Sequence, residues 1–441
     1  MTTRSRAVTA RAGSPEQVSP RRPACVKLAS GYVRREPPWT LMEEERLVMV
    51  LEVSSTRTAG PTGAGLLLAS RGDALTPFLF AELERRYPVA GILETELSRW
   101  QRLAVAAATF RPSRVRWAEQ FYKSGLGYTL RSRNAEELRR RSAAPEAPVL
   151  QVHALFDVAG SGGSLLYVDC THRQSAAAWP AWNPLRGAAL ERWYARETAA
   201  YRAARHVFAF SSATRDSLVD EYGVDPAAVS VVGAGANGGL PEPRELRGAA
   251  VGDAPNLLFI GNDFARKGGP DLLEAFTAVR RRFPRATLRL VGTRPDVVAP
   301  PGVEVLGRVH DRDLIGRLYA QADVFVLPSV FDPFPLVLLE AMARGVPIVT
   351  TASCGIPDVV RDQVEGHVVR ANDPVGLTAA IVRSLADPAR SASMAATARQ
   401  RVRREFTWER VVDRMAPVLD GLLLPGPDGS SAGAQGRSPS R

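Results

Sequence analysis

Short apolar runs recur along this chain, and stretches with apolar residues at helical spacing separate them. Strands buried on both faces read as continuous apolar runs, so strands are predicted over Arg46–Val53, Val149–Val152, Leu165–Val168, His206–Phe210, Val229–Val232, Asn256–Ile260, Thr287–Val291, Val303–Leu306, Val324–Leu327, Ile348–Thr350 and Gly366–Val369. Helices are predicted over Leu66–Ser70, Arg186–Ala204, 212–222, 270–283, 312–319, Leu336–Ala343, Val375–Leu385, Ser391–Phe406 and from Thr407 onward. This alternation is typical of mostly parallel sheets covered by helices, so the fold class is doubly wound α/β.

One stretch, from Val324 to Asp358, organises the second half of the chain. Its first strand is followed by an irregular loop that carries Asp332, and then by the short helix Leu336–Ala343, which carries Glu340. Gly345 ends that helix, because glycine tolerates the left-handed conformation of a helix cap. Two acids eight positions apart therefore stand at a strand-to-helix switch.

The chemistry of Glu340 follows from its apolar surroundings. A buried carboxylate is costly unless it meets hydrogen-bond donors, and the vicinal hydroxyls of a sugar or ribose are such donors. The free N–H groups at the start of the helix favour a phosphate beside those hydroxyls. The stretch therefore suits a ligand with a sugar at one end, phosphate in the middle and ribose at the other.

A second phosphate-binding signal follows the strand Asn256–Ile260. The loop after it contains Arg266, Lys267, Gly268 and Gly269, and a helix begins there. The lysine supplies a compact positive charge, and the glycines let a phosphate reach backbone N–H groups. A solvated basic loop is the alternative interpretation, but the position between strand and helix favours phosphate binding.

Residues 328–347 form the run P-S-x-x-D-x-F-x-x-x-x-x-E-A-M-A-x-G-x-P. This run resembles the retaining GT-B glycosyltransferases of glycosyltransferase family 4, also called glycosyl transferases group 1, a family that includes bacterial mannosyl- and glucosyltransferases. The resemblance implies two facing Rossmann-like domains with a cleft between them. It also implies that Glu340 binds the donor ribose and that Asp332 contacts the donor sugar and pyrophosphate. The chain departs from the family at Asp332, where glutamate is usual, and at Pro335, where glycine is usual and proline lacks an N–H.

The resemblance extends to further positions. It implies catalytic roles for Asp332, Lys267 and His172, and it implies donor contacts from Arg266, Lys267, Gly268, Arg308, Val309, Asp332, Phe334, Pro335, Leu336, Val337 and Glu340. No cofactor is expected beyond the nucleotide-diphosphate sugar as co-substrate, and no catalytic metal. Asp311 lies in a D-x-D run that could hold a metal-bound nucleotide, but its place before a predicted helix favours a cap.

Candidate residues of the first domain are harder to identify. A glycine-rich turn that includes Gly63 and Gly65 resembles the family's N-terminal loop, which faces acceptor and donor. His172 follows a predicted strand, as does the family histidine that points into the cleft, and His153 competes with it for that role. A structural hydrogen bond is an equally good interpretation of a histidine after a strand.

Residues 233–238 read G-x-G-x-x-G after a strand, the spacing of a dinucleotide-binding loop. That motif requires a helix that opens within it, whereas Pro241 and Pro243 follow here. The run is therefore interpreted as an interdomain turn, with residues 244–254 as linker.

Composition sets further bounds. The chain has 441 residues, 45% hydrophobic and 23% charged, which is typical of globular domains. Its three cysteines are scattered, which favours reduced thiols and a cytoplasmic setting. No secretory signal or membrane-spanning run is recognised. Of the net charge of +11, residues 1–40 contribute +6, from seven Arg and one Lys against two Glu.

These observations predict a disordered basic tail (1–40), an N-terminal acceptor domain (41–250), a C-terminal donor domain (251–406), a terminal helix that crosses back (407–424) and a disordered tail (425–441). The predicted function is metal-independent hexosyl transfer, with retention of configuration, from a nucleotide-diphosphate sugar to an unidentified hydroxyl acceptor. No nucleic-acid partner is expected, and the basic tail could hold the protein at the inner face of a membrane. The alternatives are a non-catalytic nucleotide-sugar binder, an NAD-dependent oxidoreductase and a nucleic-acid binder.

Overall fold

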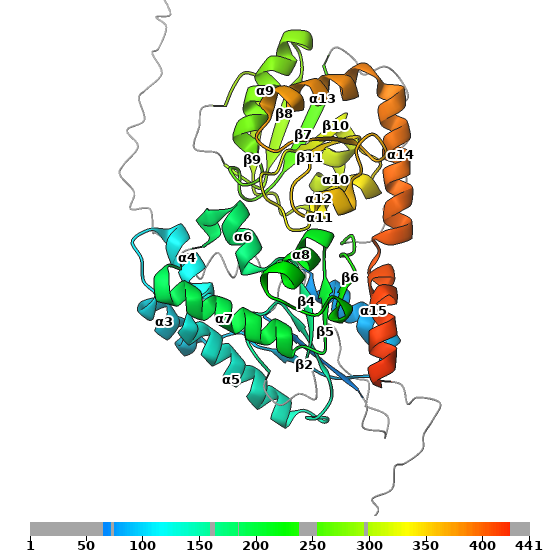
Figure 1. The fold of residues 1–441 in the computed structure, drawn as a ribbon. Helices are drawn as coiled ribbons and strands as arrows, with labels where there is room; N and C mark the ends of the chain where they lie inside the picture. The colour runs from blue at the N-terminus through cyan, green and yellow to red at the C-terminus, as the bar shows by residue number, and fades with distance from the viewer. Residues whose placement is uncertain are drawn as a thin grey trace, which may run out of the picture.

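The chain folds into two sheets, each covered by helices, that lie one above the other in Figure 1. The computed structural model describes residues 65–71, 75–158, 164–183, 185–237, 254–294 and 299–423. The strand prediction at Arg46–Val53 and the glycine at position 63 lie outside these ranges.

The first sheet has six parallel strands in the order β2-β1-β3-β4-β5-β6. The strands are β1 (Leu66–Ser70), β2 (Val89–Glu94), β3 (Val149–Val152), β4 (Ser164–Val168), β5 (His206–Ala209) and β6 (Val229–Val231). The helices of this half are α2 (Thr76–Arg86), α3 (Arg99–Ala108), α4 (Arg114–Tyr122), α5 (Gly125–Arg141), α6 (His172–Ala178), α7 (Gly187–Ala203) and α8 (Ser212–Asp216), with short helical turns at Pro180–Trp182, Ser217–Glu221 and Pro226–Ala228.

One predicted helix is a strand. Leu66–Ser70 forms β1, which is paired on both sides by β2 and β3 and is buried at every residue. A run of five apolar or small residues fits a buried helix turn and a buried strand equally well, and only its neighbours decide between them. Gly65 consequently lies at the amino end of β1, with an added Cβ only 3.0 Å from the Ala90 Cβ.

The second sheet also has six parallel strands, in the order β12-β11-β10-β7-β8-β9. They are β7 (Asn256–Ile260), β8 (Thr287–Val291), β9 (Val303–Gly307), β10 (Val324–Leu327), β11 (Ile348–Thr351) and β12 (His367–Val369), each within one residue of its predicted bounds. The helices are α9 (Gly269–Arg282), α10 (Arg312–Gln321), α11 (Leu336–Ala343), α12 (Ile356–Val359), α13 (Pro374–Ala386), α14 (Pro388–Glu405) and α15 (Trp408–Leu423). Asp311 caps α10 as predicted, because its side chain accepts from the N–H groups of Asp313 and Leu314.

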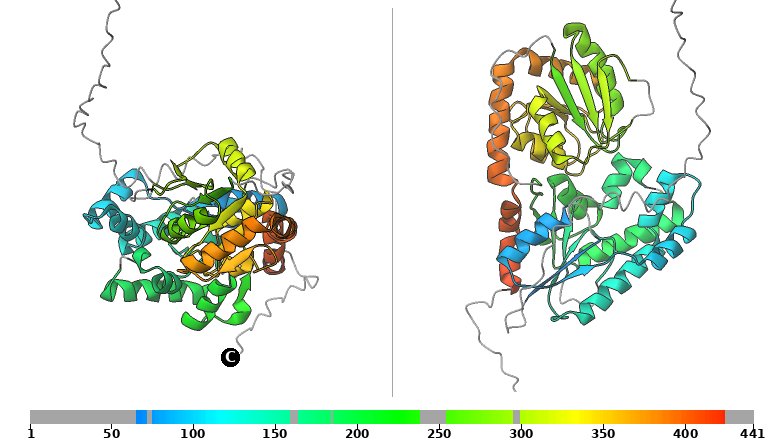
Figure 2. Two further views of the ribbon diagram at one scale, coloured as in Figure 1. Left: turned by 90° about the horizontal axis from the view of Figure 1, so that it is seen from above. Right: turned by 180° about the vertical axis from the view of Figure 1, so that it is seen from behind.

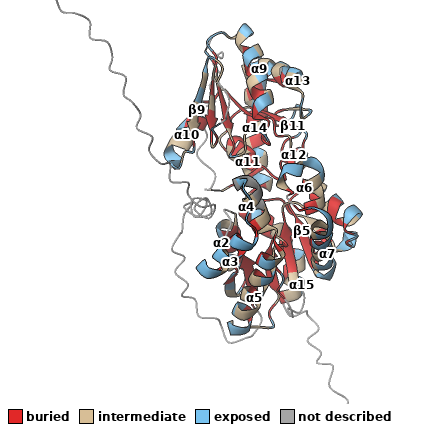
Figure 3. Ribbon diagram, turned by 90° about the vertical axis from the view of Figure 1, so that its left-hand side faces the viewer, coloured by how far each residue is buried: buried red, intermediate tan, exposed pale blue. Residues whose placement is uncertain are grey.

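The core of each half is its sheet, whose strands are buried between the covering helices (Figure 3). Val324–Leu327 is wholly buried, and each such large apolar side chain contributes roughly 1.5–3 kcal/mol relative to exposure. The apolar core is continuous between the halves, because the Phe334 ring lies edge-on 5.9 Å from that of Phe210 and 6.1 Å from that of Phe406.

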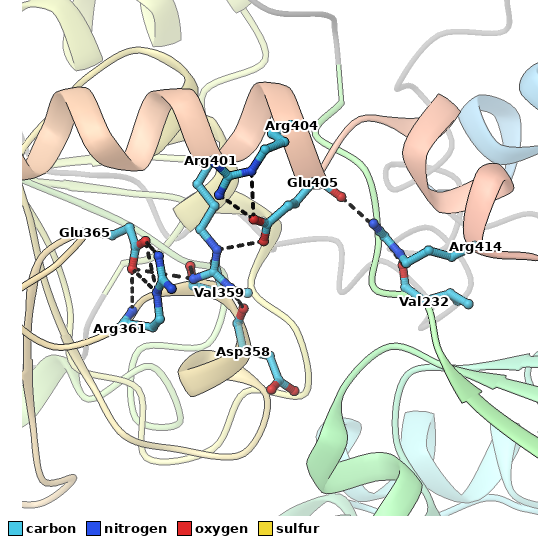
Figure 4. Close-up of polar contacts among 9 residues, drawn as sticks. All are labelled: Val232, Asp358, Val359, Arg361, Glu365, Arg401, Arg404, Glu405 and Arg414. Carbon is cyan, nitrogen blue, oxygen red and sulfur yellow. Dashed lines mark hydrogen bonds and ion pairs between the residues drawn. The ribbon is translucent and has the colours of Figure 1, made fainter.

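The two halves are also joined along one side by α14 and α15, as Figure 1 and the right-hand view of Figure 2 show. α14 packs on α11 of the second half, and α15 packs on α2 of the first. At the junction Arg414 donates to the carbonyls of Val232 (2.6 Å) and Glu405 (2.9 Å), as Figure 4 shows. Among the described residues, no helix has the length and hydropathy needed to cross a bilayer.

Candidate active site

Lys267 and Asp332 are brought together by the order of the strands. Lys267 follows β7 and Asp332 follows β10, and these two strands are neighbours in the second sheet. The Lys267 Nζ donates to Asp332 Oδ2, and the two residues are only 8% and 4% exposed. This buried ion pair lies at the carboxyl edge of the sheet, where doubly wound domains bind ligands.

In the loop that carries Lys267, the neighbouring backbone leaves no room for a side chain at Gly268. Gly268 has φ +74°, and a Cβ there would lie 1.9 Å from the carbonyl oxygen of Pro328. The loop after β10 is tied to it, because the Val330 N–H donates to the Arg266 carbonyl at 2.9 Å. The two loops therefore form one rigid unit that fixes the ion pair.

Two opposing effects act on the pKa of Lys267, and the net result is a lowered value. Burial lowers the pKa of Lys267, while the neighbouring Asp332 carboxylate acts in the opposite direction. The Ser329 hydroxyl also donates to Asp332 Oδ2 at 3.4 Å. A diphosphate arriving here would meet an ammonium group that already lacks water and that has one anionic partner.

Arg266 connects this loop to the first domain. Its guanidinium lies 4.4 Å from the centre of the Trp182 ring, and its Nη1 donates to the Phe331 carbonyl at 2.9 Å. The Trp182 ring in turn lies edge-on to Phe331, with centroids 5.7 Å apart. Arg266 is therefore held between the two domains, with Asp263 Oδ2 3.5 Å from its Nε.

Glu340 is placed apart from this ion pair. It lies on α11, and its Oε2 accepts from the Tyr319 hydroxyl at 3.2 Å. The Arg344 guanidinium lies over the Tyr319 ring, 4.8 Å from its centre. Burial raises the pKa of Glu340, and Arg344 opposes that shift. No contact among the described residues joins Glu340 to Lys267 or Asp332.

The remaining predicted donor residues divide into two groups. Pro335 precedes α11, and Leu336 and Val337 form its first turn, so their backbone faces the start of the helix. The side chain of Phe334 is buried in the aromatic contact between the domains. Arg308 and Val309 follow β9 at the carboxyl edge, where the Gly292 N–H donates to the Gly307 carbonyl at 2.7 Å.

The first sheet presents its own row of polar side chains. Arg71, His153 and Asp169 directly follow β1, β3 and β4, which are neighbours in that order. His153 Nδ1 lies 3.1 Å from Asp169 Oδ1, and its backbone has φ +60°, which is unusual for a residue with a side chain. The buried Gln151 side chain donates to the His153 carbonyl at 2.7 Å and holds this conformation.

These side chains line a cavity of about 450 Å³ that also reaches the second domain. Its lining includes His172 and, from the other domain, Asn262, Asp263 and Arg266. His172 begins α6, and its Nε2 is hydrogen bonded to Asn183 Oδ1 at 2.9 Å. Burial, and then the nearby Lys123, lower the pKa of His172 to about 4, so its imidazole is neutral at pH 7. Both candidate histidines thus face one cavity.

Known proteins match the chain most clearly in its second half. The family model described as glycosyl transferases group 1 matches residues 254–387. A glycogen synthase of Mycobacterium tuberculosis is 30% identical over 240 residues, which are 52% of this chain and only 56% of that protein, about half its length. An alpha-maltose-1-phosphate synthase of Mycolicibacterium smegmatis is 30% identical over 332 residues, 66% of this chain and 84% of that protein. The chain belongs to the group 1 glycosyltransferases.

A solved structure is consistent with the fold of this glycosyltransferase. HepE of Anabaena, in complex with UDP and glucose, aligns with a TM-score of 0.52 and 18% identity over 81% of this chain and all of that one. The predicted GT-B architecture is therefore confirmed.

The fold places one predicted site glycine of this glycosyltransferase. Gly65 precedes β1 and lies at the amino end of the first sheet, whereas the cavity lies at the carboxyl ends. The G-x-G-x-x-G run, interpreted from the sequence as a turn and not as a dinucleotide-binding loop, contacts the terminal helix, because a Cβ at Gly235 would lie 2.6 Å from the Trp408 ring. The Ala236 N–H donates to the Phe406 carbonyl at 2.8 Å.

Several residues of the cavity were not predicted from the sequence. They are Arg71, Lys123, Asp169 and Glu197. Arg71 and Asp169 could have been recognised from the sequence, because each is a polar residue directly after a buried strand. This pattern was obscured at Arg71 because Leu66–Ser70 was read as a helix.

Proposed function

We propose that this glycosyltransferase moves a hexosyl group from a nucleotide-diphosphate sugar to a hydroxyl acceptor, with retention of configuration and without a catalytic metal. The observation that carries the proposal is the buried Lys267–Asp332 pair at the carboxyl edge of the second sheet, beside Arg266, which lines the cavity of the first. HepE, which shares the fold, is a complex with UDP and glucose, and this supports a nucleotide-sugar donor.

In the proposed complex, the diphosphate lies between Lys267 and the first turn of α11. The Lys267 ammonium and the unpaired N–H groups of that turn stabilise negative charge on the leaving group. Pro335 contributes no N–H, so this part of the binding depends on Leu336 and Val337. Arg266 closes the site from its place between the domains.

The sugar and the ribose are held by acids. Glu340 accepts hydrogen bonds from the ribose hydroxyls in place of its bond from Tyr319. Asp332 orients the hexose. The neutral imidazole of His172 lies in the cavity where the hexose meets the acceptor.

Retention follows in the proposal from attack on the face that the leaving group occupies. The bond from the anomeric carbon to the phosphate oxygen breaks, and the bond to the acceptor oxygen forms on the same side. The acceptor proton passes to the departing phosphate oxygen, so no protein base is required. Retaining glycosidases instead use two carboxyl groups about 5–5.5 Å apart.

The test combines binding, turnover and stereochemistry. Calorimetry with UDP-, GDP- and ADP-linked hexoses should identify a donor, and Glu340→Gln and Lys267→Met should weaken its binding about tenfold or more. Glu304→Gln, an exposed glutamate on β9 of the same domain, serves as control. Proton NMR of the product should show the anomeric configuration of the donor, and EDTA should leave the rate unchanged.

Three results would count against the proposal. Tight binding of NADH without binding of any nucleotide sugar would favour the oxidoreductase. Donor binding without transfer or hydrolysis would favour a non-catalytic binder. An inverted product would refute the same-face mechanism.

A further inference from the structure

Residues of both domains line the cavity. Arg71, His153 and Asp169 line it in the order of their strands, β1, β3 and β4. Arg266 enters from the second domain, from the loop that also carries Lys267. A molecule that fills the cavity would therefore contact both Arg71 and this loop.

The acids that line the cavity are already engaged. Asp169 lies 3.1 Å from His153, and Asp263 Oδ2 lies 3.5 Å from the Arg266 Nε. Glu197 accepts from a tyrosine hydroxyl, and burial raises its pKa to about 7, so its negative charge is only partly present at neutral pH. Each of these acids therefore already has a partner in the protein.

Arg71 has no such partner. Its guanidinium lies 4.7 Å from the centre of the Tyr122 ring, and no carboxylate among the described residues pairs with it. Its Nε is buried and donates to no described atom. A buried N–H without an acceptor is costly, because it has lost its water without gaining a hydrogen bond.

A second arginine lies beside Arg71. Arg131 is 3% exposed and lies 6.0 Å from the same Tyr122 ring. Its pKa falls to about 10, first because it is buried and then because Arg71 is near. Repulsion between these two cations is unfavourable unless an anion joins them.

We propose that the cavity binds an acceptor that carries a phosphate or carboxylate group, and that Arg71 binds this oxyanion. The inference rests on the proposed transferase function and specifies its acceptor. The planar guanidinium can donate two parallel hydrogen bonds to an oxyanion, which a neutral hydroxyl cannot accept in the same way. The hydroxyl that is glycosylated lies at the other end, toward Arg266.

The arrangement makes the site selective for charge. A neutral sugar would leave the buried Nε–H of Arg71 without a charged acceptor, whereas an anionic sugar satisfies it and offsets the repulsion from Arg131. Charge-assisted hydrogen bonds of this kind correspond to about a tenfold preference or more for the anionic member of a matched pair.

The test is calorimetry with matched probes in the presence of UDP. Glucose, glucose 6-phosphate, glucose 1-phosphate and glucuronate are titrated into the wild-type protein, Arg71→Gln and Arg192→Gln. Arg192 is exposed on α7 and serves as the control for loss of one positive charge. At least one anionic sugar should bind about tenfold or more tightly than glucose to the wild type and to Arg192→Gln. In Arg71→Gln the preference should fall to about twofold or less.

The probes also distinguish the sources of the anion. Preference for the phosphates over glucuronate assigns a phosphate, and the reverse assigns a carboxylate. Binding only to vesicles that contain phosphatidylinositol, with the same dependence on Arg71, assigns a lipid-linked phosphate. Equal binding of glucose and all anionic probes, or a preference that survives in Arg71→Gln, would overturn the inference. Nucleotide-sugar binding is measured separately, so its absence would refute the proposed function and not this selectivity.

Discussion

At the residue scale, Lys267 and Asp332 form a buried ion pair in which each charge is balanced by the other. Both side chains are nearly inaccessible to water, and each is the other's charged partner. Removing one partner leaves the other charge buried alone, which costs about 3–5 kcal/mol, whereas removing both avoids that penalty. The pair thus contributes to the stability of the fold, and we propose that it also binds the donor.

Lys267→Met and Asp332→Asn are therefore each expected to lower the free energy of unfolding by about 3–5 kcal/mol. The double variant should lose clearly less than the sum, because the second substitution removes the isolated charge that the first creates. Urea unfolding of the four proteins measures this coupling. Additive losses would mean that the two side chains do not interact in solution.

Glu197 provides a pH-dependent test at the same scale. Burial raises its pKa from 4.5 to about 7 in the folded protein, so the folded state binds a proton more strongly than the unfolded chain. Its contribution to stability is therefore complete below pH 4.5 and is lost as the pH rises to 7. His172, with a pKa lowered from 6.5 to about 4, has the opposite effect, because stability rises as the pH increases through that range.

Because the two effects oppose each other, the prediction concerns a difference. Glu197→Gln keeps an oxygen for the Tyr222 hydroxyl and cannot ionise. Its stability relative to the wild type should rise between pH 4.5 and 7, by up to about 3 kcal/mol. Chemical unfolding at several pH values measures the difference, with Glu191→Gln, exposed on the same helix, as control. A flat difference would show that Glu197 does not titrate in this range.

The predictability of individual residues depended on where their partners lie in the sequence. Glu340 and Lys267 were found because local spacing places each at a strand-to-helix switch. The pairing of Lys267 with Asp332 needed the neighbour relation of β7 and β10, which no local pattern contains. Arg71 was missed for the same reason, since its place beside His153 follows from the pairing of β1 with β3.

At the element scale, the second sheet was predictable and the first was partly not. The strands of the second sheet are buried runs bounded by turn residues, and their predicted bounds differ by at most one residue from those observed. β1 was misread because five apolar or small residues carry no periodicity that separates strand from helix. Because of that error Gly65 was expected before a helix, whereas it directly precedes β1.

The glycine after Lys267 offers a test of a loop. Gly268→Ala would place a Cβ 1.9 Å from the Pro328 carbonyl oxygen at a positive φ, so the loop must move. The expected loss of stability is about 3 kcal/mol or more, together with weaker donor binding. Gly316→Ala is the matched control, because nothing lies within 4 Å of its added Cβ in α10, and it should stabilise by about 0.5–1 kcal/mol. Thermal unfolding compares them, and similar effects of both would contradict the tight contact.

At the scale of the whole molecule, the contacts that join the two domains within the described residues include three between segments far apart in the sequence. The Phe334 ring packs between Phe210 and Phe406. The Asp358 carboxylate accepts from the Ser212 N–H at 2.6 Å, across the same boundary. The third contact is the junction of α14 and α15, where Arg414 lies (Figure 4). In the proposed function the donor and acceptor sites lie on different domains, so these contacts would set the distance between them.

A substitution of Arg414 tests the junction of α14 and α15 directly, because its side chain makes hydrogen bonds on both sides of the junction. Its guanidinium donates to the carbonyls of Val232 and Glu405, so one side chain joins the end of the first sheet to the end of α14. Arg414→Gln leaves these carbonyls with poorer partners and should cost about 1–3 kcal/mol. The Ala236 amide, which donates to the Phe406 carbonyl beside this junction, should then exchange its hydrogen faster.

Arg410→Gln, one turn earlier on α15, is the control, because its exposed ion pair with Asp413 contributes about 1 kcal/mol or less. Hydrogen exchange and urea unfolding of both variants separate a general effect of charge from loss of the junction. If Ala236 exchanges equally fast in both, the Arg414 contacts do not hold the domains together. If only Arg414→Gln exchanges faster and its rate of transfer also falls, the junction holds the donor and acceptor sites at their working distance.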